Sequence, residues 1–155
     1  MPASLLDVNV WLAATFEAHP AHRSARAVLL QATPAEPTLF CRSTQQSFLR
    51  LASTPAISTA YQAGEITNRD ALAALMAFLA LPQVDLMDEP IGTEAIWWRL
   101  AGLEQAAPKR WMDAYLAAFA ISGSLRMISL DQDFRVFIAA GLDLRLLQAD
   151  GGGSG

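Results

Sequence analysis

The sequence predicts an α/β fold in which a parallel sheet carries helices on both faces. Short apolar runs alternate with longer segments of helical character along the whole chain. Strands that alternate with helices form parallel sheets, because each crossover helix packs back onto a face of the sheet. The 155 residues, 53% of them apolar and 17% charged, suffice for one packed domain and are too few for two.

The expected strands are short and mostly apolar, which is typical of strands buried on both faces of a sheet. The first, Ala3 to Leu6, is followed directly by Asp7, and the run from Arg126 to Leu130 is followed directly by Asp131. In chain order, the expected strands span residues 3–6, 38–41, 84–87, 126–130 and 144–147.

The expected helices are recognised by apolar periodicity and by the residues that start and stop them. In the segment 68–81, Asn68 can cap the helix, and an apolar stripe at helical spacing runs from Leu72 to Leu79. Pro55 is expected to stop the helix before it, and Pro82 to end this one. In chain order, the expected helices span residues 10–16, 19–31, 43–52, 68–81, 92–102, 110–122 and 133–139.

The domain is expected to cover residues 1–148, and the Gly/Ser-rich residues 149–155 to form a flexible linker remnant outside the fold. No apolar run approaches the roughly 20 residues of a membrane span. The N-terminus shows no basic and apolar leader, so we expect a cytoplasmic protein without membrane contact. Cys41 is the only cysteine, which excludes an internal disulfide and a thiolate metal cluster. The net charge of −4 does not suit a broad basic face for nucleic acid.

Asp7, Asp113 and Asp131 are the residues that point most directly to chemistry. Each lies in an apolar stretch next to a predicted strand or helix end. A carboxylate is costly to bury unless it is paired or binds a metal. In α/β sheets, ligands bind beyond the carboxyl ends of the strands, where Asp7 and Asp131 fall. Mg²⁺ and Mn²⁺ prefer such oxygen ligands, so these acids predict a site for a hard divalent cation.

Each acid also has a structural alternative. Asp7 and Asp131 could cap the helices that follow them, and Asp113 could interact with the positive end of its own helix from the first turn. Asn9 could hydrogen-bond a carboxylate or a metal-bound water, or serve only as a first-turn residue. Asp133 could be an accessory ligand or a surface acid.

Other groups of residues give weaker evidence for a functional site. His19 and His22 are spaced by three residues and are expected to be ordinary surface histidines. A structural zinc site usually needs four ligands, often thiolates, and these are not available here. Trp97 and Trp98 could stack on bases, but at helical spacing one of them is expected in the core or a dimer interface. The basic residues considered for phosphate contacts are Arg42, Arg50, Arg99, Lys109 and Arg110. With no glycine-rich phosphate loop and no nucleophile turn, metal-assisted hydrolysis remains the favoured chemistry.

Four segments in this order resemble the PIN-domain ribonucleases, specifically the VapC toxins of bacterial VapBC toxin–antitoxin modules. Residues 5–9 resemble the opening strand with its first acid, and residues 43–51 the segment of the second acid. Residues 112–116 resemble the motif of the third acid, and residues 129–134 the final acidic turn. The resemblance covers nearly all of residues 3–148.

The resemblance implies a PIN-like three-layer α/β/α sandwich with a mainly parallel central sheet. It implies a Mg²⁺-dependent endoribonuclease toxin, Mn²⁺ being an alternative ion, in which Asp7, Asp113 and Asp131 hold the metal. Gln45 and Asn9 would orient water or phosphate, and Ser129 and Asp133 would be accessory. The implied partners are an RNA substrate, a second copy in a homodimer, and a VapB-type antitoxin whose tail crosses the active cleft.

Two departures from the family pattern leave an alternative open. Many members have Glu where this chain has Gln45, which removes one negative charge, and Met112 replaces a commonly polar residue. With fewer carboxylates the metal should bind more weakly. The alternative is a catalytically weakened PIN domain that acts as an RNA- or protein-binding module. A haloacid-dehalogenase-like phosphotransferase built on residues 7–9 fits less well, because that chemistry uses a second aspartate at residue 9.

Overall fold

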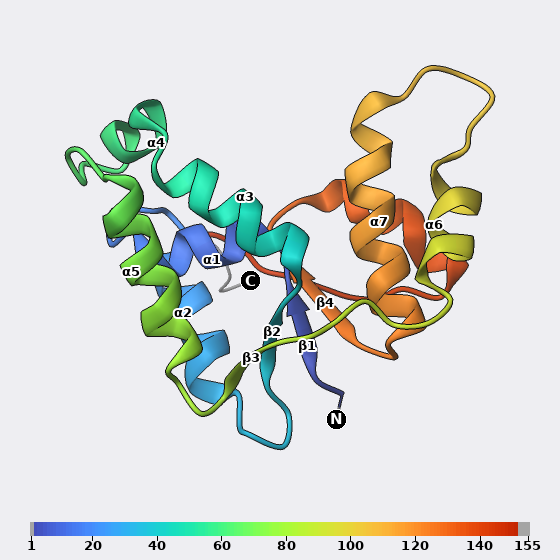
Figure 1. Cartoon of the computed structure of the whole chain (residues 1–155), viewed down its shortest axis with the longest axis horizontal. Helices are drawn as coiled ribbons and strands as arrows, with labels where there is room; N and C mark the ends of the chain where they lie inside the picture. Colours follow the sequence, from blue (N-terminus) through green and yellow to red (C-terminus); the bar gives the residue numbers. More distant parts are fainter. Residues whose placement is uncertain (1, 152–155) are drawn as a thin grey trace.

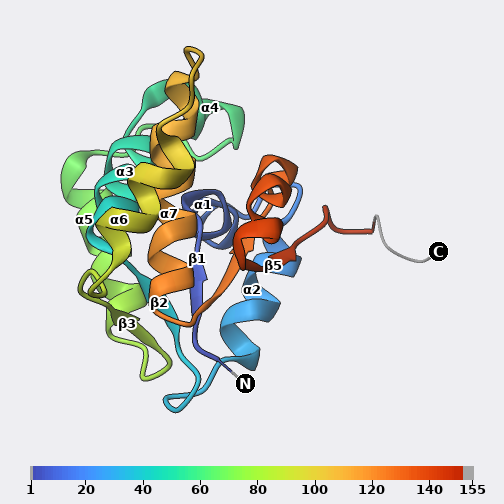
Figure 2. The ribbon, with the colours of Figure 1, turned by 90° about the vertical axis from the view of Figure 1, so that its right-hand side faces the viewer.

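A five-stranded sheet forms the centre of the protein in the computed structural model, which describes residues 2–151 (Figures 1 and 2). The strand order is β3-β2-β1-β4-β5, and every neighbouring pair runs parallel. The predicted α/β class with a parallel sheet is therefore confirmed. The strands are β1 (Ser4–Leu6), β2 (Thr38–Phe40), β3 (Val84–Leu86), β4 (Arg126–Ser129) and β5 (Asp143–Leu146).

The two faces of the sheet are covered by two separate apolar layers. Successive side chains of a strand point to opposite faces, so adjacent apolar residues supply both cores. Leu5 and Leu6 show this in β1, since Leu5 packs in one apolar cluster and Leu6 in the other. The same division separates Leu39 from Phe40 in β2, and Met127 from Ile128 in β4. This arrangement explains why the central strands are continuous apolar runs.

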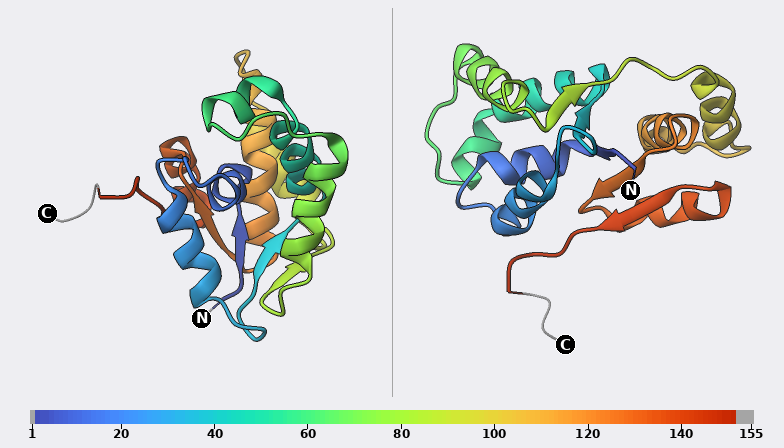
Figure 3. Two further views of the ribbon diagram at one scale, coloured as in Figure 1. Left: turned by 90° about the vertical axis from the view of Figure 1, so that its left-hand side faces the viewer. Right: turned by 90° about the horizontal axis from the view of Figure 1, so that it is seen from below.

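The helices divide between these faces, which gives three layers (Figures 1 and 3). The cluster with Leu6 and Phe40 is covered by α1 (Val8–Thr15), α2 (His22–Gln31), α3 (Arg42–Ala52) and α5 (Asn68–Leu79). The cluster with Leu5 and Leu39 is covered by α6 (Thr93–Ala101), α7 (Pro108–Ser122) and the 3₁₀ helix η1 (Gln132–Ala140). The short helix α4 (Pro55–Ala60) connects α3 to the loop before α5.

Several helix boundaries differ from those predicted, and two of the differences lie at prolines that begin a helix. Pro55 occupies the first turn of α4, and Pro108 begins α7 two residues before the predicted start. Proline suits a first helical turn, where its missing N–H has no partner to lose. Helix α5 is capped by Thr67, which exchanges hydrogen bonds with Asp70, rather than by Asn68. The earlier start of α7 changes the position of Asp113 within its helix.

The chain remains packed beyond the predicted domain boundary at residue 148. The carboxylate of Asp150 accepts hydrogen bonds from the backbone N–H groups of Arg23 and Ser24, at 2.8 and 2.9 Å, in the first turn of α2. The rest of the predicted tail, residues 152–155, lies outside the described residues. Within residues 2–151, no helix has the length and apolar character needed to span a membrane.

We expect the Trp11 ring, but not its N–H, to stabilise the first core. Trp11 is fully buried and stacks on Phe40 with ring centroids 3.8 Å apart. The Trp11 Nε1–H finds no acceptor among the described residues. Burying this unpaired N–H group therefore offsets part of the stability that the packed ring contributes. In urea denaturation, Trp11→Ala should lower the free energy of unfolding by about 3–5 kcal/mol, and Trp11→Phe by less than about 1.5 kcal/mol. Equal losses for the two variants would contradict this expectation, because they would mean that the ring contributes nothing beyond the N–H.

Candidate functional site

The candidate site lies where the neighbouring strands β1 and β4 end. Leu6 is paired with Ile128 in the parallel register, and the Asp7 N–H continues the ladder by donating to the Ile128 carbonyl at 2.9 Å. The residues after the two strands therefore emerge side by side at one edge of the sheet. Asp7 and Asp131 are brought to the same edge, as predicted from their positions after strands.

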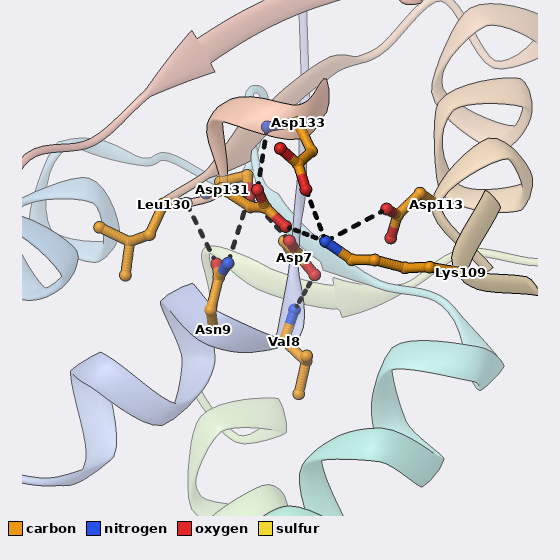
Figure 4. A network of polar contacts seen from close by, with 9 residues as sticks. Asp7, Val8, Asn9, Lys109, Asp113, Leu130, Asp131 and Asp133 are labelled. Carbon is orange, nitrogen blue, oxygen red and sulfur yellow. Dashed lines mark hydrogen bonds and ion pairs between the residues drawn. The ribbon is translucent and has the colours of Figure 1, made fainter. Parts of the chain in front are cut away.

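The Ser129 hydroxyl is the centre of the hydrogen bonds that shape this edge. It donates to Asp7 Oδ2 at 2.7 Å and accepts from the Asp131 backbone N–H at 2.9 Å and from Asn9 Nδ2 at 3.3 Å. A hydroxyl can donate one hydrogen bond and accept two, so the hydrogen-bonding capacity of the Ser129 hydroxyl is completely satisfied. Asn9 Oδ1 in turn accepts from the Leu130 N–H at 3.2 Å (Figure 4). Ser129 and Asn9 thus position the loop that carries Asp131 against Asp7.

Asp7 is a buried carboxylate without a cationic partner among the described residues. Its side chain accepts from Ser129 and, at 2.7 Å, from the Val8 N–H, and only 6% of the residue is exposed. Burial raises the pKa of Asp7 to about 6, and the nearby charges of Asp113 and Asp131 act in the same direction. The two hydrogen bonds oppose this rise only partly. Asp7 does cap α1, as the structural alternative proposed, but a cap does not explain why an acid is buried beside other acids.

Asp113 reaches the same region from α7, on the other side of the site (Figure 4). Because α7 begins at Pro108, Asp113 lies beyond the first turn, and the predicted first-turn position is wrong. The interaction of a charge with the helix end falls off within the first turn, so that alternative loses its support. Burial raises the pKa of Asp113, with Asp131 and Asp133 contributing to the rise and Lys109 and Arg110 opposing it.

Lys109 places an ammonium group among three of the acids (Figure 4). Its Nζ lies 2.7 Å from Asp133 Oδ2, 3.1 Å from Asp131 Oδ2 and 3.8 Å from Asp113 Oδ2. Hydrogen bonds to Asp133 and Asp131 raise the pKa of Lys109 well above its usual range. From the sequence, Lys109 is expected only as a phosphate contact. The signal for its contact with Asp113 is their spacing of four residues, which places both side chains on one helix face.

The side chains of this edge suit a divalent cation in their chemistry, although their arrangement does not enclose a single ion. Within residues 2–151, no three His, Cys, Asp or Glu side chains are arranged to hold a single metal ion. The shared ion of Asp7, Asp113 and Asp131 therefore stays a prediction. The chemistry fits nevertheless, because the donors are carboxylate oxygens, Asp7 is buried without a cation, and the Lys109 ammonium already takes a cationic position between the others.

Gln45 is buried near the same edge, but its contact is with Arg42. Helix α3 follows β2, which is paired with β1, so both strands end at the same side of the sheet. Gln45 Oε1 accepts from Arg42 Nη1 at 2.6 Å, and Gln45 is 4% exposed. None of the hydrogen bonds within residues 2–151 joins Gln45 to Asp7, Asp113 or Asp131. Its role in the site remains a prediction.

The histidines and the tryptophan pair lie apart from this network of hydrogen bonds. His19 Nδ1 accepts from the Ala21 N–H at 3.0 Å, and His22 Nδ1 is 2.8 Å from the Ala13 carbonyl oxygen. Both contacts are local structural ones. Trp97 packs edge-on against Trp111 and Tyr115, and Trp98 is 56% exposed on α6.

Comparison with known proteins identifies the family to which this chain belongs. The family model of the PIN domain matches residues 4–138 of this chain. The solved VapBC2 complex of Rickettsia felis bound to a DNA fragment from its promoter superposes with a TM-score of 0.66, at 14% identity, over 94% of this chain and 99% of the matched chain. Mycobacterium tuberculosis VapC20, a toxin that cleaves the sarcin–ricin loop, superposes with a TM-score of 0.62, at 17% identity, over 92% and 99%. The chain belongs to the PIN-domain family.

A relative in sequence narrows this class further. Ribonuclease VapC41 of Mycobacterium tuberculosis is 43% identical over 144 residues, which cover 92% of this chain and 97% of the relative; the proteins of strains CDC 1551 and H37Rv match equally. Within the family, this chain is a VapC-type ribonuclease, the toxin of a VapBC toxin–antitoxin system.

The raised pKa of Asp7 predicts how stability depends on pH in the metal-free protein. The folded-state pKa of about 6 lies above the usual value of an unfolded aspartate, so the folded protein holds the proton more tightly. The stability due to this group is complete below about pH 4 and is lost as the pH rises through about 6, by up to roughly 3 kcal/mol.

In urea denaturation with EDTA, Asp7→Asn should match wild type near pH 4.5 and exceed it at pH 8. The exposed Asp88 serves as the control, because Asp88→Asn should follow the wild-type curve throughout. If the curves of Asp7→Asn and wild type stay parallel from pH 4.5 to 8, Asp7 does not titrate in this range.

Proposed function

We propose that this ribonuclease is a Mg²⁺-dependent endoribonuclease whose metal is held by Asp7, Asp113 and Asp131. The observation that carries the proposal is the buried Asp7 carboxylate at the carboxyl end of β1. It has no cation among the described residues, and it lies near enough to Asp131, which follows β4, and to Asp113 of α7 for their charges to raise its pKa. Mg²⁺ accepts such a site because one or two carboxylates and retained waters suffice for it, and Mn²⁺ fits the same oxygen ligands.

The residues around the acids have positioning roles. A bound divalent ion would supply charge stabilisation at the scissile phosphate and a more acidic water. Ser129 and the Val8 N–H hold the two oxygens of Asp7 in place. Asn9 fixes the Leu130 backbone, and Asp131 accepts from the Asp133 N–H at 2.9 Å, so the acidic loop has a defined shape. Asp133 is proposed as an accessory acid and Gln45 as a group that orients water or phosphate.

The proposed partners are RNA, a VapB-type antitoxin and a second copy of this chain. The VapC class of the chain supports the first two, since the related R. felis VapBC2 toxin and antitoxin were solved as a complex. The exposed Trp98, Trp111 and Met112 on α6 and α7 support the third, since large apolar side chains in one region of a surface often belong to an interface. We propose that the protein acts in the cytoplasm, where these partners are found.

A catalytically weakened PIN domain that acts mainly as an RNA- or protein-binding module is the competing proposal, and Gln45 is the observation that favours it. With Gln in place of Glu the site has one charge fewer, and the metal should bind more weakly. The two proposals differ in one measurable respect. A nuclease loses RNA cleavage when an acid is neutralised, whereas a binding module has no metal-dependent cleavage to lose.

Neutralising Asp113 should abolish cleavage without unfolding the protein. We expect Asp113→Asn to lower the Mg²⁺-dependent cleavage rate by about 100-fold or more, because part of the charge stabilisation is lost. The melting temperature without metal should stay the same or rise slightly, because burial and the neighbouring acids disfavour the Asp113 charge. Asp88→Asn is the control and should cleave like wild type. Equal cleavage by Asp113→Asn and wild type would contradict the proposed site.

Restoring the fourth charge should lower the Mg²⁺ requirement. If Gln45 faces the metal, Gln45→Glu should strengthen binding by roughly 1–2 kcal/mol, as expected for one carboxylate at about 4–6 Å. The midpoint of a Mg²⁺ titration of cleavage should then move to lower concentration. Turnover need not rise, because tighter binding in the ground state does not by itself stabilise the transition state.

The exposed neighbour Gln46 provides the matched control for this titration. Gln46→Glu adds the same charge on the same helix but on its exposed side, and should leave the midpoint unchanged. Equal midpoints for Gln45→Glu and wild type would place Gln45 outside the metal site.

A further inference from the structure

Lys109 is a cation located where the proposed metal ligands need one. It is the only lysine of the sequence, and its Nζ lies within 3.1 Å of both Asp131 and Asp133 and 3.8 Å from Asp113. Two of these three acids are proposed metal ligands. Figure 4 shows the lysine side chain extending from α7 toward Asp131 and Asp133.

The stability of the fold does not account for this arrangement. The side chains of Lys109 and Asp133 are 64% and 68% exposed, and ion pairs at such exposure contribute little to folding. Asp131 also does not need Lys109 for its position. It is held by hydrogen bonds that involve the backbone, from its own N–H to Ser129 and from the Asp133 N–H to its Oδ1. The ammonium therefore neutralises a proposed metal ligand that is already in place.

A divalent ion and the Lys109 ammonium would compete for the same oxygen atoms. Asp131 Oδ2, at 3.1 Å from Nζ, would be shared between them. Two cations about 4 Å apart repel each other, and the divalent one gains more from the acids, so the ammonium must leave. Its exposed, flexible four-carbon chain can move at low cost. The buried Asp7 is not among the ion-pair partners of Lys109, and only a cation that enters more deeply would neutralise it.

A cavity of about 430 Å³ beside the acids offers the displaced side chain a new position. It is lined by Lys109 and Arg110 together with Pro108, Asp113, Asp133 and Phe137. The Arg110 guanidinium lies over the Phe137 ring, 5.2 Å from its centroid, which holds this second cation at the cavity. Both basic residues belong to the first turn of α7, where the helix end adds positive potential. A phosphate group of an RNA strand suits this position.

We propose that Lys109 is a displaceable counter-ion of the metal site that becomes a phosphate-positioning residue once the divalent ion binds. The inference rests on the proposed metal-dependent cleavage. Lys109 neutralises Asp131 and Asp133 while no metal is bound. When the divalent ion binds, it displaces the Lys109 side chain, which then contacts a phosphate of the RNA backbone. Metal binding and RNA binding are thereby coupled through one side chain.

The first test measures metal binding alone. Mn²⁺ binding, followed by electron paramagnetic resonance of the free ion, should be about tenfold tighter for Lys109→Met than for wild type, as expected when a unit charge about 4–6 Å from a cation is removed. Arg135→Met is the matched control. It removes one positive charge from the exposed side of η1, where Arg135 contacts Gln132, and should shift the Kd less than twofold. Equal Kd values for Lys109→Met and wild type, or equal shifts in both variants, would overturn the proposal.

The second test measures cleavage at saturating Mg²⁺. Lys109→Met should raise the KM for RNA severalfold while it lowers the Mg²⁺ concentration needed for half-maximal rate, and Arg135→Met should change neither. A variant that was only damaged structurally would lose both metal and RNA binding. An unchanged KM would overturn the phosphate-positioning role.

These outcomes also separate this inference from the proposed function. If wild type binds Mn²⁺ and cleaves RNA but Lys109→Met behaves identically, the inference fails and the metal site stands. If neither protein binds Mn²⁺, there is no ion to displace the lysine, and both are overturned.

Discussion

The burial of the Asp7 carboxylate is the constraint around which the candidate site is built. An ionised carboxylate loses its hydration on burial and must be compensated by hydrogen bonds, a cation or a proton. Two hydrogen bonds, from Ser129 and Val8, compensate it in part, and the pKa remains raised to about 6. The protein therefore holds a carboxylate at a position where a cation or a proton is still needed to complete its environment. A fold that keeps such a group gives up some stability, which is typical of a functional site.

The sheet makes this burial possible because it brings two strand ends together from distant parts of the sequence. Asp7 and Ser129 are 122 positions apart, yet their strands are neighbours with a defined register. The apolar layers on both faces hold β1 and β4 rigidly, since Leu5 and Met127 pack on one side and Leu6 and Ile128 on the other. Helix α7 then brings Asp113 and Lys109 to the same edge. A side chain positioned by packed strands and helices is held more accurately than one on a free loop.

The sequence predicted the parts of this arrangement that depend on periodicity and strand ends. The parallel sheet, the strand positions and the placement of Asp7 and Asp131 at one edge follow from apolar runs that end in acids. It did not predict that Pro55 and Pro108 begin helices, because proline disfavours a helix interior but suits its first turn. The contacts of Lys109 with Asp131 and Asp133 were also missed. They depend on how η1 packs beside α7, and nothing within either segment encodes that geometry.

If the proposed ion binds at this edge, the charge balance of the site would keep its affinity moderate. Lys109 adds a positive charge beside Asp131, and Gln45, if it takes the position that the family resemblance implies, stands where many PIN domains have a negatively charged Glu. Both changes weaken the attraction for a divalent ion, while the raised pKa of Asp7 adds competition from protons as the pH falls toward 6. A loosely held ion leaves the acids open to other cations. Basic side chains of a protein partner are such cations, and Lys109 shows within this chain how an ammonium group reaches these carboxylates. In the proposed metal site, the same weak attraction that would let Mg²⁺ exchange would also leave the site open to neutralisation by a protein that presents a basic residue to it.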